Sequence, residues 1–419
     1  MPPHYSTGSP AFMFDLAAPE EWAYSPGDTI IGNLVRKLPI VTPEASVKLS
    51  FAGRVKVKIV VQSGRTKKVY RDNWQLLDFP EIVLFQGPLH LPEGSDESLS
   101  WPISVNIPYQ PMDSCRQGHS QKCSFAPLAS DHPIHHTLPG SFLSESTSWG
   151  AKWNPDSLEF VEYYLKAEIG YNFGGHHKSH EAICPITIRP PIVQSTGVPK
   201  MFKQPRHITT QRLLPGMENA DLSFKQHAQK LFSSSKVPSF HYDVLLTVPT
   251  SIQLDDPTPM PIQIQVMPNL EKTSDSIKEV AQNIRILALE ATLRLNTHSL
   301  APGNFTDSVH QSQYSESIGL GLQRLMEALE QPLVMTTGKG NEPLNIGDLF
   351  QLTLHDWGVM AGNKKLPLDS WRNTKLTPDF TTYNIQRTHQ LEWRITLEIA
   401  GEKEKYKFIN PVEIIAPAY

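Results

Sequence analysis

Residues 24–59 read YSPGDTIIGNLVRKLPIVTPEASVKLSFAGRVKVKI, and this stretch decides the fold. Residues 25–28 (SPGD) predict a tight turn, because proline restricts φ and glycine accepts positive φ. Apolar and polar residues then alternate with the period of a β-strand up to Val61. Gly53 interrupts the apolar face and predicts a β-bulge or a close backbone neighbour. The pattern is typical of a β-sandwich strand that has a core face and a basic face.

Composition narrows the class of protein further. A chain of 419 residues is long enough for two or three domains with sizeable cores. The net charge of -4 gives no case for nucleic-acid binding, and no apolar run reaches the eighteen or so residues of a membrane helix. The first twenty residues have neither the basic nor the apolar part of a signal peptide. Three cysteines favour a reducing cytoplasm over a disulfide framework.

Two strand-rich blocks are predicted, joined by a polar connector. We expect a first β-sandwich at residues 10–190 with a Ser-, His- and Pro-rich loop insertion at 111–154, a linker at 191–236, and a second β-sandwich at 237–416. Strands without intervening helices argue for an all-β fold rather than an α/β fold. Helical spacing of apolar residues predicts helices at 217–232 and 314–331, and the second would pack against the C-terminal sandwich.

Several motifs occur in the order and spacing of one family. They are the Pro-Gly-Asp turn, residues 138–142 (LPGSF), residues 161–167 (VEYYLKA), and residues 377–385 (TPDFTTYNI) followed by Trp393. Residues 89–108 are similar to the strand that precedes LPxSF in that family. Together these segments resemble the arrestin family, and the fungal α-arrestin-like trafficking adaptors are the nearest subgroup. The resemblance covers most of the chain.

The resemblance implies two tandem arrestin-type β-sandwiches and a non-enzymatic role. Such an adaptor is expected in the cytoplasm, with transient recruitment to the plasma membrane or endosomes. It would bind the cytoplasmic tails of membrane transporters or receptors and link them to ubiquitination and endocytic sorting. The alternative within the same fold is a retromer-type sorting subunit that works without ligase recruitment.

Adaptors of this type recruit HECT-type ubiquitin ligases through PPxY motifs, and residues 2–5 read PPHY. Pro2 and Pro3 favour a polyproline II segment, and the Tyr5 ring suits the aromatic-lined groove of a WW domain. Such a short motif also arises by chance, so an incidental match is the competing interpretation.

A second candidate site is the basic face of the long strand and the turn that follows. Clustered cations bind phosphate, carboxylate or anionic lipid head groups, so this face is a candidate for cargo tails or for peripheral membrane contact. A solvated strand face is the alternative interpretation. The residues are Lys48, Arg54, Lys56, Lys58, Arg65, Lys67, Lys68 and Arg71.

The sequence contains no catalytic motif, and we predict no catalytic residue, no metal site and no cofactor. Cys115, His119 and Cys123 precede His132, His135 and His136, but the paired spacing of a zinc site is absent. His176, His177 and His180 are no better organised. A metal-dependent β-sandwich enzyme that uses the His-rich loop is the alternative from a different functional class.

Overall fold

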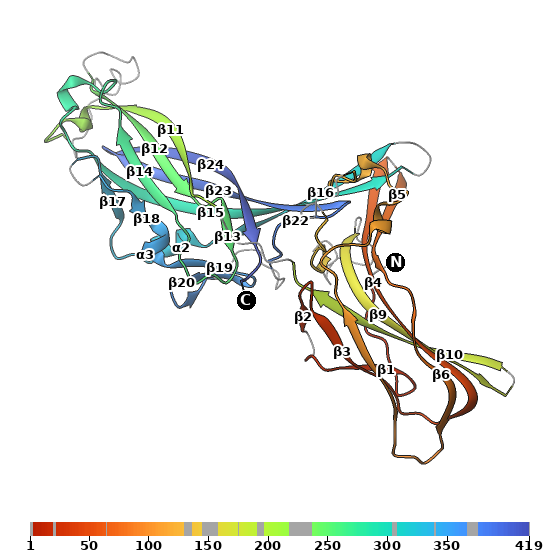
Figure 1. Ribbon diagram of the computed structural model, residues 1–419. Coiled ribbons are helices and arrows are strands. Elements are labelled where there is room, and N and C mark those ends of the chain that lie inside the picture. Colours follow the sequence, from red (N-terminus) through yellow and green to blue (C-terminus); the bar gives the residue numbers. More distant parts are fainter. Residues whose placement is uncertain are drawn as a thin grey trace. The chain divides into compact units, whose positions relative to one another are not determined.

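The computed structural model describes residues 3–19, 22–63, 65–129, 136–144, 158–174, 176–190, 197–217, 237–303, 308–338, 341–366 and 376–418. Strands dominate these residues (Figure 1), which confirms the all-β prediction. The chain divides into two compact units. Unit 1 comprises residues 1–191, 297–314 and 380–387, and unit 2 comprises residues 192–296, 315–379 and 388–419.

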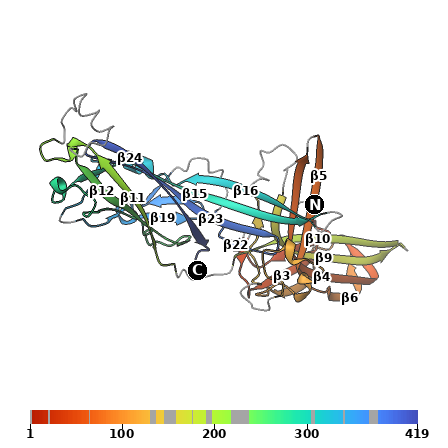
Figure 2. The same cartoon turned by 90° about the horizontal axis from the view of Figure 1, so that it is seen from above.

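Unit 1 contains two sheets that share one buried apolar cluster. The smaller sheet has the order β1 (Met13–Leu16), β3 (Thr29–Arg36) and β7 (Leu99–Asn106). The larger sheet has the order β2 (Ala23–Tyr24), β10 (His176–Ile188), β9 (Leu158–Phe173), β4 (Ile40–Ser63) and β5 (Thr66–Asp78), and it also pairs β6 (Ile82–Leu91) with β4 and β8 (Phe142–Leu143) with β9. Figure 2 shows β9 and β10 side by side in this sheet.

Strand β4 confirms the alternation expected from the sequence. Val47, Val55 and Ile59 on its predicted core face are each at most 2% exposed. Its register with β5 shifts between Gly53 and Arg54, which is the expected irregularity. Gly53 also lies opposite the buried Tyr163 of β9, and a Cβ at Gly53 would lie 2.4 Å from Cδ1 of that ring. The predicted bulge is therefore confirmed, whereas the close neighbour is a tyrosine side chain and not the predicted backbone.

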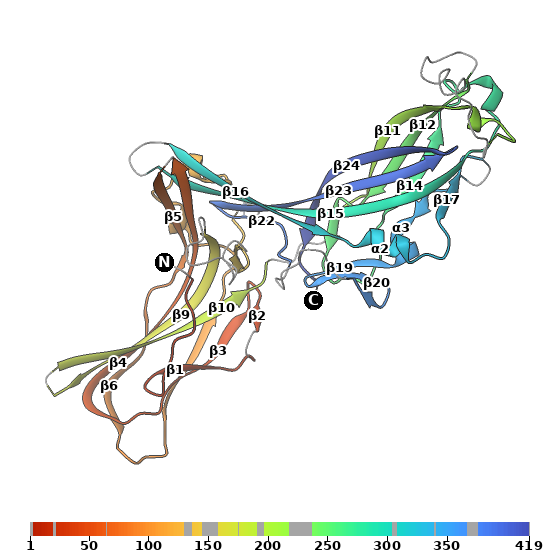
Figure 3. The ribbon, with the colours of Figure 1, turned by 180° about the vertical axis from the view of Figure 1, so that it is seen from behind.

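Unit 2 is also built from sheets around its own core, and their strands are antiparallel except where β13 pairs with β24. A four-stranded sheet has the order β11 (Lys200–Thr209), β12 (Ser239–Val248), β14 (Gln263–Pro268) and β18 (Leu344–Asn345) (Figure 3). A seven-stranded sheet has the order β13 (Ser251–Gln253), β24 (Glu402–Ile415), β23 (Ile385–Ile399), β15 (Asn283–Pro302) and β16 (Val309–Gly319), with β17 (Leu333–Thr336) on β15 and β22 (Phe380–Thr381) on β23. A third sheet contains β19 (Leu352–His355), β20 (Gly358–Ala361) and β21 (Lys364–Lys365). Strands β15, β16 and β23 each have residues in both units, and β22 belongs to unit 1.

Strand β11 lies inside the range that was predicted as linker. Its residues pair with β12 along their whole length, from Lys200 opposite Val248 to Thr209 opposite Ser239. The strand lies at the edge of its sheet, and most of its side chains are exposed. An edge strand of this kind shows little apolar alternation, so periodicity did not reveal it. The helix predicted at 217–232 lies almost entirely outside the described residues.

The helix predicted at 314–331 is wrong over its first part. Residues 314–319 belong to β16, and the helix α2 is limited to Leu322–Glu327. Gly321, with φ +74°, precedes α2 and ends the extended backbone. Leu322 is buried in the core of unit 2, so the expected packing of the helix against the C-terminal sandwich is confirmed. A second short helix, α3 (Ile346–Phe350), lies in unit 2.

Candidate docking site on the outer face of the large sheet

Residues 3–9, here called the N-terminal segment, contact the larger sheet of unit 1 at two places. His4 lies on the outer face of the sheet, and Thr7 pairs with the edge of β10 that faces away from β9. The His4 backbone N–H donates to Glu162 Oε2 at 2.6 Å, and the His4 ring lies 4.1 Å from the Tyr164 ring, centroid to centroid. Three residues further on, Thr7 forms an antiparallel bridge to Ile183 of β10. The bridge has N–H···O distances of 2.9 and 3.0 Å, and the Ile183 N–H also contacts Thr7 Oγ1.

Under His4 lies a buried ion pair between neighbouring strands. Arg54 of β4 stands directly opposite Glu162 of β9, each residue is 9% exposed, and Arg54 Nε donates to Glu162 Oε1. The Arg54 guanidinium also lies 5.7 Å from the centre of the Tyr164 ring. Burying two charges is tolerable when they are paired and further hydrogen bonds satisfy them. The His4 N–H provides one of those bonds, so the segment completes the coordination of the carboxylate.

The hydrogen bonds of the His4 ring depend on its protonation state. Nδ1 lies 3.2 Å from both Glu162 Oε1 and Arg54 Nη2, so it accepts from the arginine when neutral and donates to the carboxylate when that nitrogen is protonated. Burial is the main cause that lowers the pKa of His4, with Arg54 and Lys56 acting in the same direction and Glu162 opposing them. The docked segment therefore favours neutral His4. Docking is expected to weaken as the pH falls below the ordinary value of 6.5.

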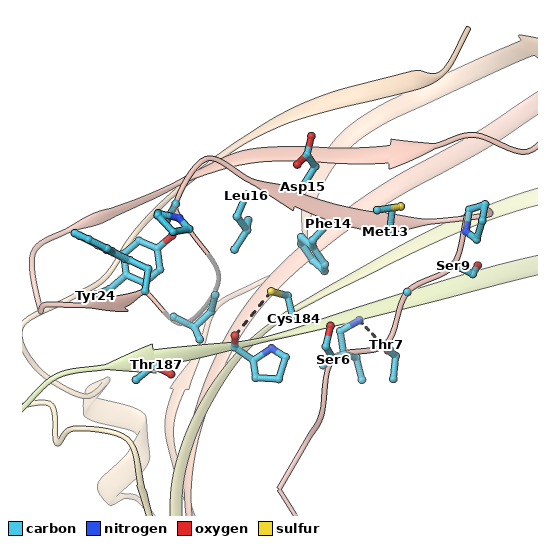
Figure 4. A pocket seen from close by; sticks show the side chains of 18 residues that line it. Ser6, Thr7, Ser9, Met13, Phe14, Asp15, Leu16, Tyr24, Cys184 and Thr187 are labelled. Atoms are coloured by element: carbon cyan, nitrogen blue, oxygen red, sulfur yellow. Dashed lines mark hydrogen bonds between the residues drawn. The ribbon is translucent and has the colours of Figure 1, made fainter. Parts of the chain in front are cut away.

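A pocket of ≈ 750 Å³ lies beside the same segment. It is lined by residues 6–10, by β1 and β2, and by residues 183–187 of β10 (Figure 4). Cys184 and Tyr24 contribute to the lining, and the buried Tyr24 hydroxyl has no hydrogen-bond partner among the described residues. After Thr7 the chain borders this pocket, and Ser9 forms a bridge to Phe12 with N–H···O distances of 3.1 and 2.8 Å. Before Ser9, His4 and Thr7 form the hydrogen bonds that join the segment to the sheet.

The predicted PPxY residues differ in their exposure. Tyr5 is 75% exposed, whereas Pro3 is half-buried. Pro2 lies outside the described residues. Sequence reasoning did not predict that His4, the variable residue of the motif, contacts Glu162 and Tyr164. Strand alternation in residues 161–165 places Glu162 and Tyr164 on the outer face, but it cannot show which residue lies opposite them.

The predicted basic face is partly wrong. Arg54 is buried and paired with Glu162, so its charge is not exposed for cargo binding. Lys56 is half-buried, and burial is the main cause that lowers its pKa. Lys48 pairs with Glu81 at 2.9 Å on the surface, and Lys58 is half-buried. The pairing with Glu162 and the covering N-terminal segment thus remove Arg54 from the predicted patch.

Four cations remain exposed near the turn between β4 and β5. We call Arg65, Lys67, Lys68 and Arg71 the basic hairpin. Arg71 stands directly opposite Lys58, while Lys68 stands opposite Val61 and points to the other face of the hairpin. The basic hairpin thus presents exposed cations on both of its faces.

The His-rich insertion is structured where it is described. Cys115 and Cys123 are buried, the Cys115 thiol lies 3.2 Å from the Tyr383 hydroxyl, and the His119 ring stacks on Trp74 at 3.6 Å. His132 and His135 lie outside the described residues. Among the residues that the structure describes, no three His, Cys, Asp or Glu side chains come together as metal ligands. Across all the residues that the structure describes, no helix is long and apolar enough to cross a membrane.

Comparison with known proteins adds no relative to this picture. No protein-family model matches the chain, and no curated protein matches its sequence. The resemblance to arrestins therefore stays a prediction from the sequence motifs quoted above.

Proposed function

We propose that this protein is a non-enzymatic adaptor of the arrestin type that recruits a WW-domain ubiquitin ligase of the HECT type through Pro2, Pro3 and Tyr5. The observation that carries the proposal is the exposure of Tyr5, which is 75% accessible although His4 beside it is anchored. A large aromatic side chain displayed next to proline is the element that a WW groove recognises. The two all-β units and the order of the arrestin-like motifs support the same assignment.

The proposed cargo contact is the basic hairpin rather than the whole predicted strand face. Its four cations are exposed, and Arg71 and Lys68 lie on opposite faces of β5. Acidic or phosphorylated segments in the cytoplasmic tails of transporters or receptors have the complementary chemistry. The adaptor would thereby act in the cytoplasm and reach the plasma membrane or endosomes through its cargo.

Tyr5→Ala is expected to lower the affinity of the full-length protein for an isolated HECT-ligase WW domain by at least about tenfold, because the aromatic ring is the anchor of such an interface. Isothermal titration calorimetry measures this directly. Tyr109→Ala is the matched control, since Tyr109 is also largely exposed, at 71%, and follows Pro108, but it does not stand in a PPxY sequence. Equal binding by wild type and Tyr5→Ala would contradict ligase recruitment at this site. An absence of binding in both would favour a sorting subunit that works without a ligase.

A further inference from the structure

We infer that the N-terminal segment is a latch, and that a WW domain engages its PPxY motif fully only after His4 and Thr7 have left the sheet. The inference rests on the proposed function, because it concerns the regulation of the same motif. Its observations are the two anchor points on either side of Tyr5, the half-buried Pro3 and the pocket beside residues 6–10.

One anchor, His4, lies inside the PPxY motif, and the other, Thr7, follows the motif in the sequence. His4 is the variable position of PPxY, and its backbone N–H and ring nitrogen both contact the Arg54–Glu162 pair. A polyproline II helix has three residues per turn, so His4 and Tyr5 project in different directions. The side that carries His4 faces the sheet, and the Tyr5 side chain extends into solvent. The docked segment thus leaves Tyr5 exposed to solvent while His4 is bound to the sheet.

The display is incomplete because a WW groove contacts proline as well as tyrosine. Pro3 is half-buried in the docked state, so its ring cannot be enclosed by a groove without moving. Thr7 lies two residues after Tyr5 and is bonded through both its backbone N–H and its C=O to Ile183. A WW domain that closes around the motif must therefore compete with both anchors.

The latch is weak enough to open in the folded protein. Residues 6–10 line the pocket of ≈ 750 Å³ (Figure 4), and the bonds of Ser9 and Pro10 can hold the chain in place while the part up to Thr7 leaves. The Arg54–Glu162 pair stays intact when the segment leaves, since the two residues are cross-strand neighbours. Release then costs a few hydrogen bonds and one ring contact, and it leaves the core of unit 1 unchanged.

The test measures the affinity of the full-length protein for a WW domain after each anchor is removed. Thr7→Pro eliminates the donor to the Ile183 carbonyl, and His4→Ala eliminates the ring contacts. Each is expected to raise the affinity about fivefold, the factor that the loss of one net hydrogen bond from the docked state gives. His90→Ala, an exposed histidine on β6, is the matched control and should leave the affinity unchanged.

A second readout uses pH. The groups that face His4 are Glu162 and Tyr164 on β9 and Arg54 and Lys56 on β4. Because the docked ring favours its neutral form, wild-type affinity should rise as the pH falls below 6.5, relative to a His4→Gln protein measured with the same WW domain. A parallel pH dependence in the two proteins would overturn the role of His4.

The outcomes separate the latch from the function on which it rests. Binding that is lost in Tyr5→Ala but is equal in wild type, His4→Ala and Thr7→Pro overturns the latch and leaves ligase recruitment standing. No binding by wild type or by either released variant overturns ligase recruitment and the latch with it. Tighter binding by both released variants supports the two together.

Discussion

Glu162→Ala is expected to destabilise unit 1 by about 3 kcal/mol, because it leaves the Arg54 guanidinium buried without its counter-ion. Arg54 and Glu162 are each only 9% exposed, and no other acidic side chain is bonded to Arg54 among the described residues. The His4 N–H would also lose its acceptor. Chemical denaturation that follows the transition of unit 1 measures the loss.

Two comparisons test whether burial is the cause. Glu181→Ala removes a carboxylate from the neighbouring strand β10, where it pairs with Lys166 at 2.8 Å but is 50% exposed. An exposed pair contributes less than about 1 kcal/mol, so this control should change stability little. In the double variant Arg54→Met, Glu162→Leu, no charge remains, and stability should return close to that of wild type. Equal losses in Glu162→Ala and Glu181→Ala would contradict the account.

Gly53→Ala is expected to destabilise unit 1 by about 2 kcal/mol through overpacking. The added Cβ would lie 2.4 Å from Cδ1 and 2.6 Å from Cε1 of Tyr163. That ring cannot move aside easily, because Tyr163 is 1% exposed and its hydroxyl donates to the Pro139 carbonyl at 2.6 Å. Gly319→Ala on β16 is the control, since a Cβ there meets nothing within 4 Å. A Gly53→Ala protein as stable as Gly319→Ala would show that the close approach of Tyr163 does not limit this position.

The sequence predicts the core of unit 1 well, since each feature of β4 is local. Alternation from Val47 to Ile59 identifies the buried face, and the glycine in that face identifies the bulge. Strand β9 follows from the apolar and aromatic residues around Tyr163 for the same reason. These assignments need no knowledge of which strand pairs with which.

Assignments that depend on tertiary neighbours were less successful. Residues 314–319 carry helical spacing, yet they extend along β15 as part of β16, because sheet pairing outweighs a weak local preference. Strand β11 has an exposed side and a single neighbour, so it lacks the apolar pattern that would have marked it. In both segments the missing information is the identity of the neighbouring strand.

The candidate site shows the same division. Pro3 and Tyr5 could be singled out from sequence because PPxY is a contiguous motif. The burial and pairing of Arg54 could not be predicted from sequence, because they depend on Glu162, which lies 108 positions away in the chain. Alternation placed Arg54 correctly on the outer face, but an outer face is exposed only where nothing covers it. The N-terminal segment covers this one.

Hydrogen exchange at the Ile183 amide tests the latch most directly, because that N–H donates to the Thr7 carbonyl. The account predicts that the amide is protected in the free protein and that a saturating WW domain removes this protection. In Tyr5→Ala the same WW domain should leave the protection unchanged. Protection that persists in the wild-type protein saturated with the WW domain would contradict the claim that docking and ligase binding compete.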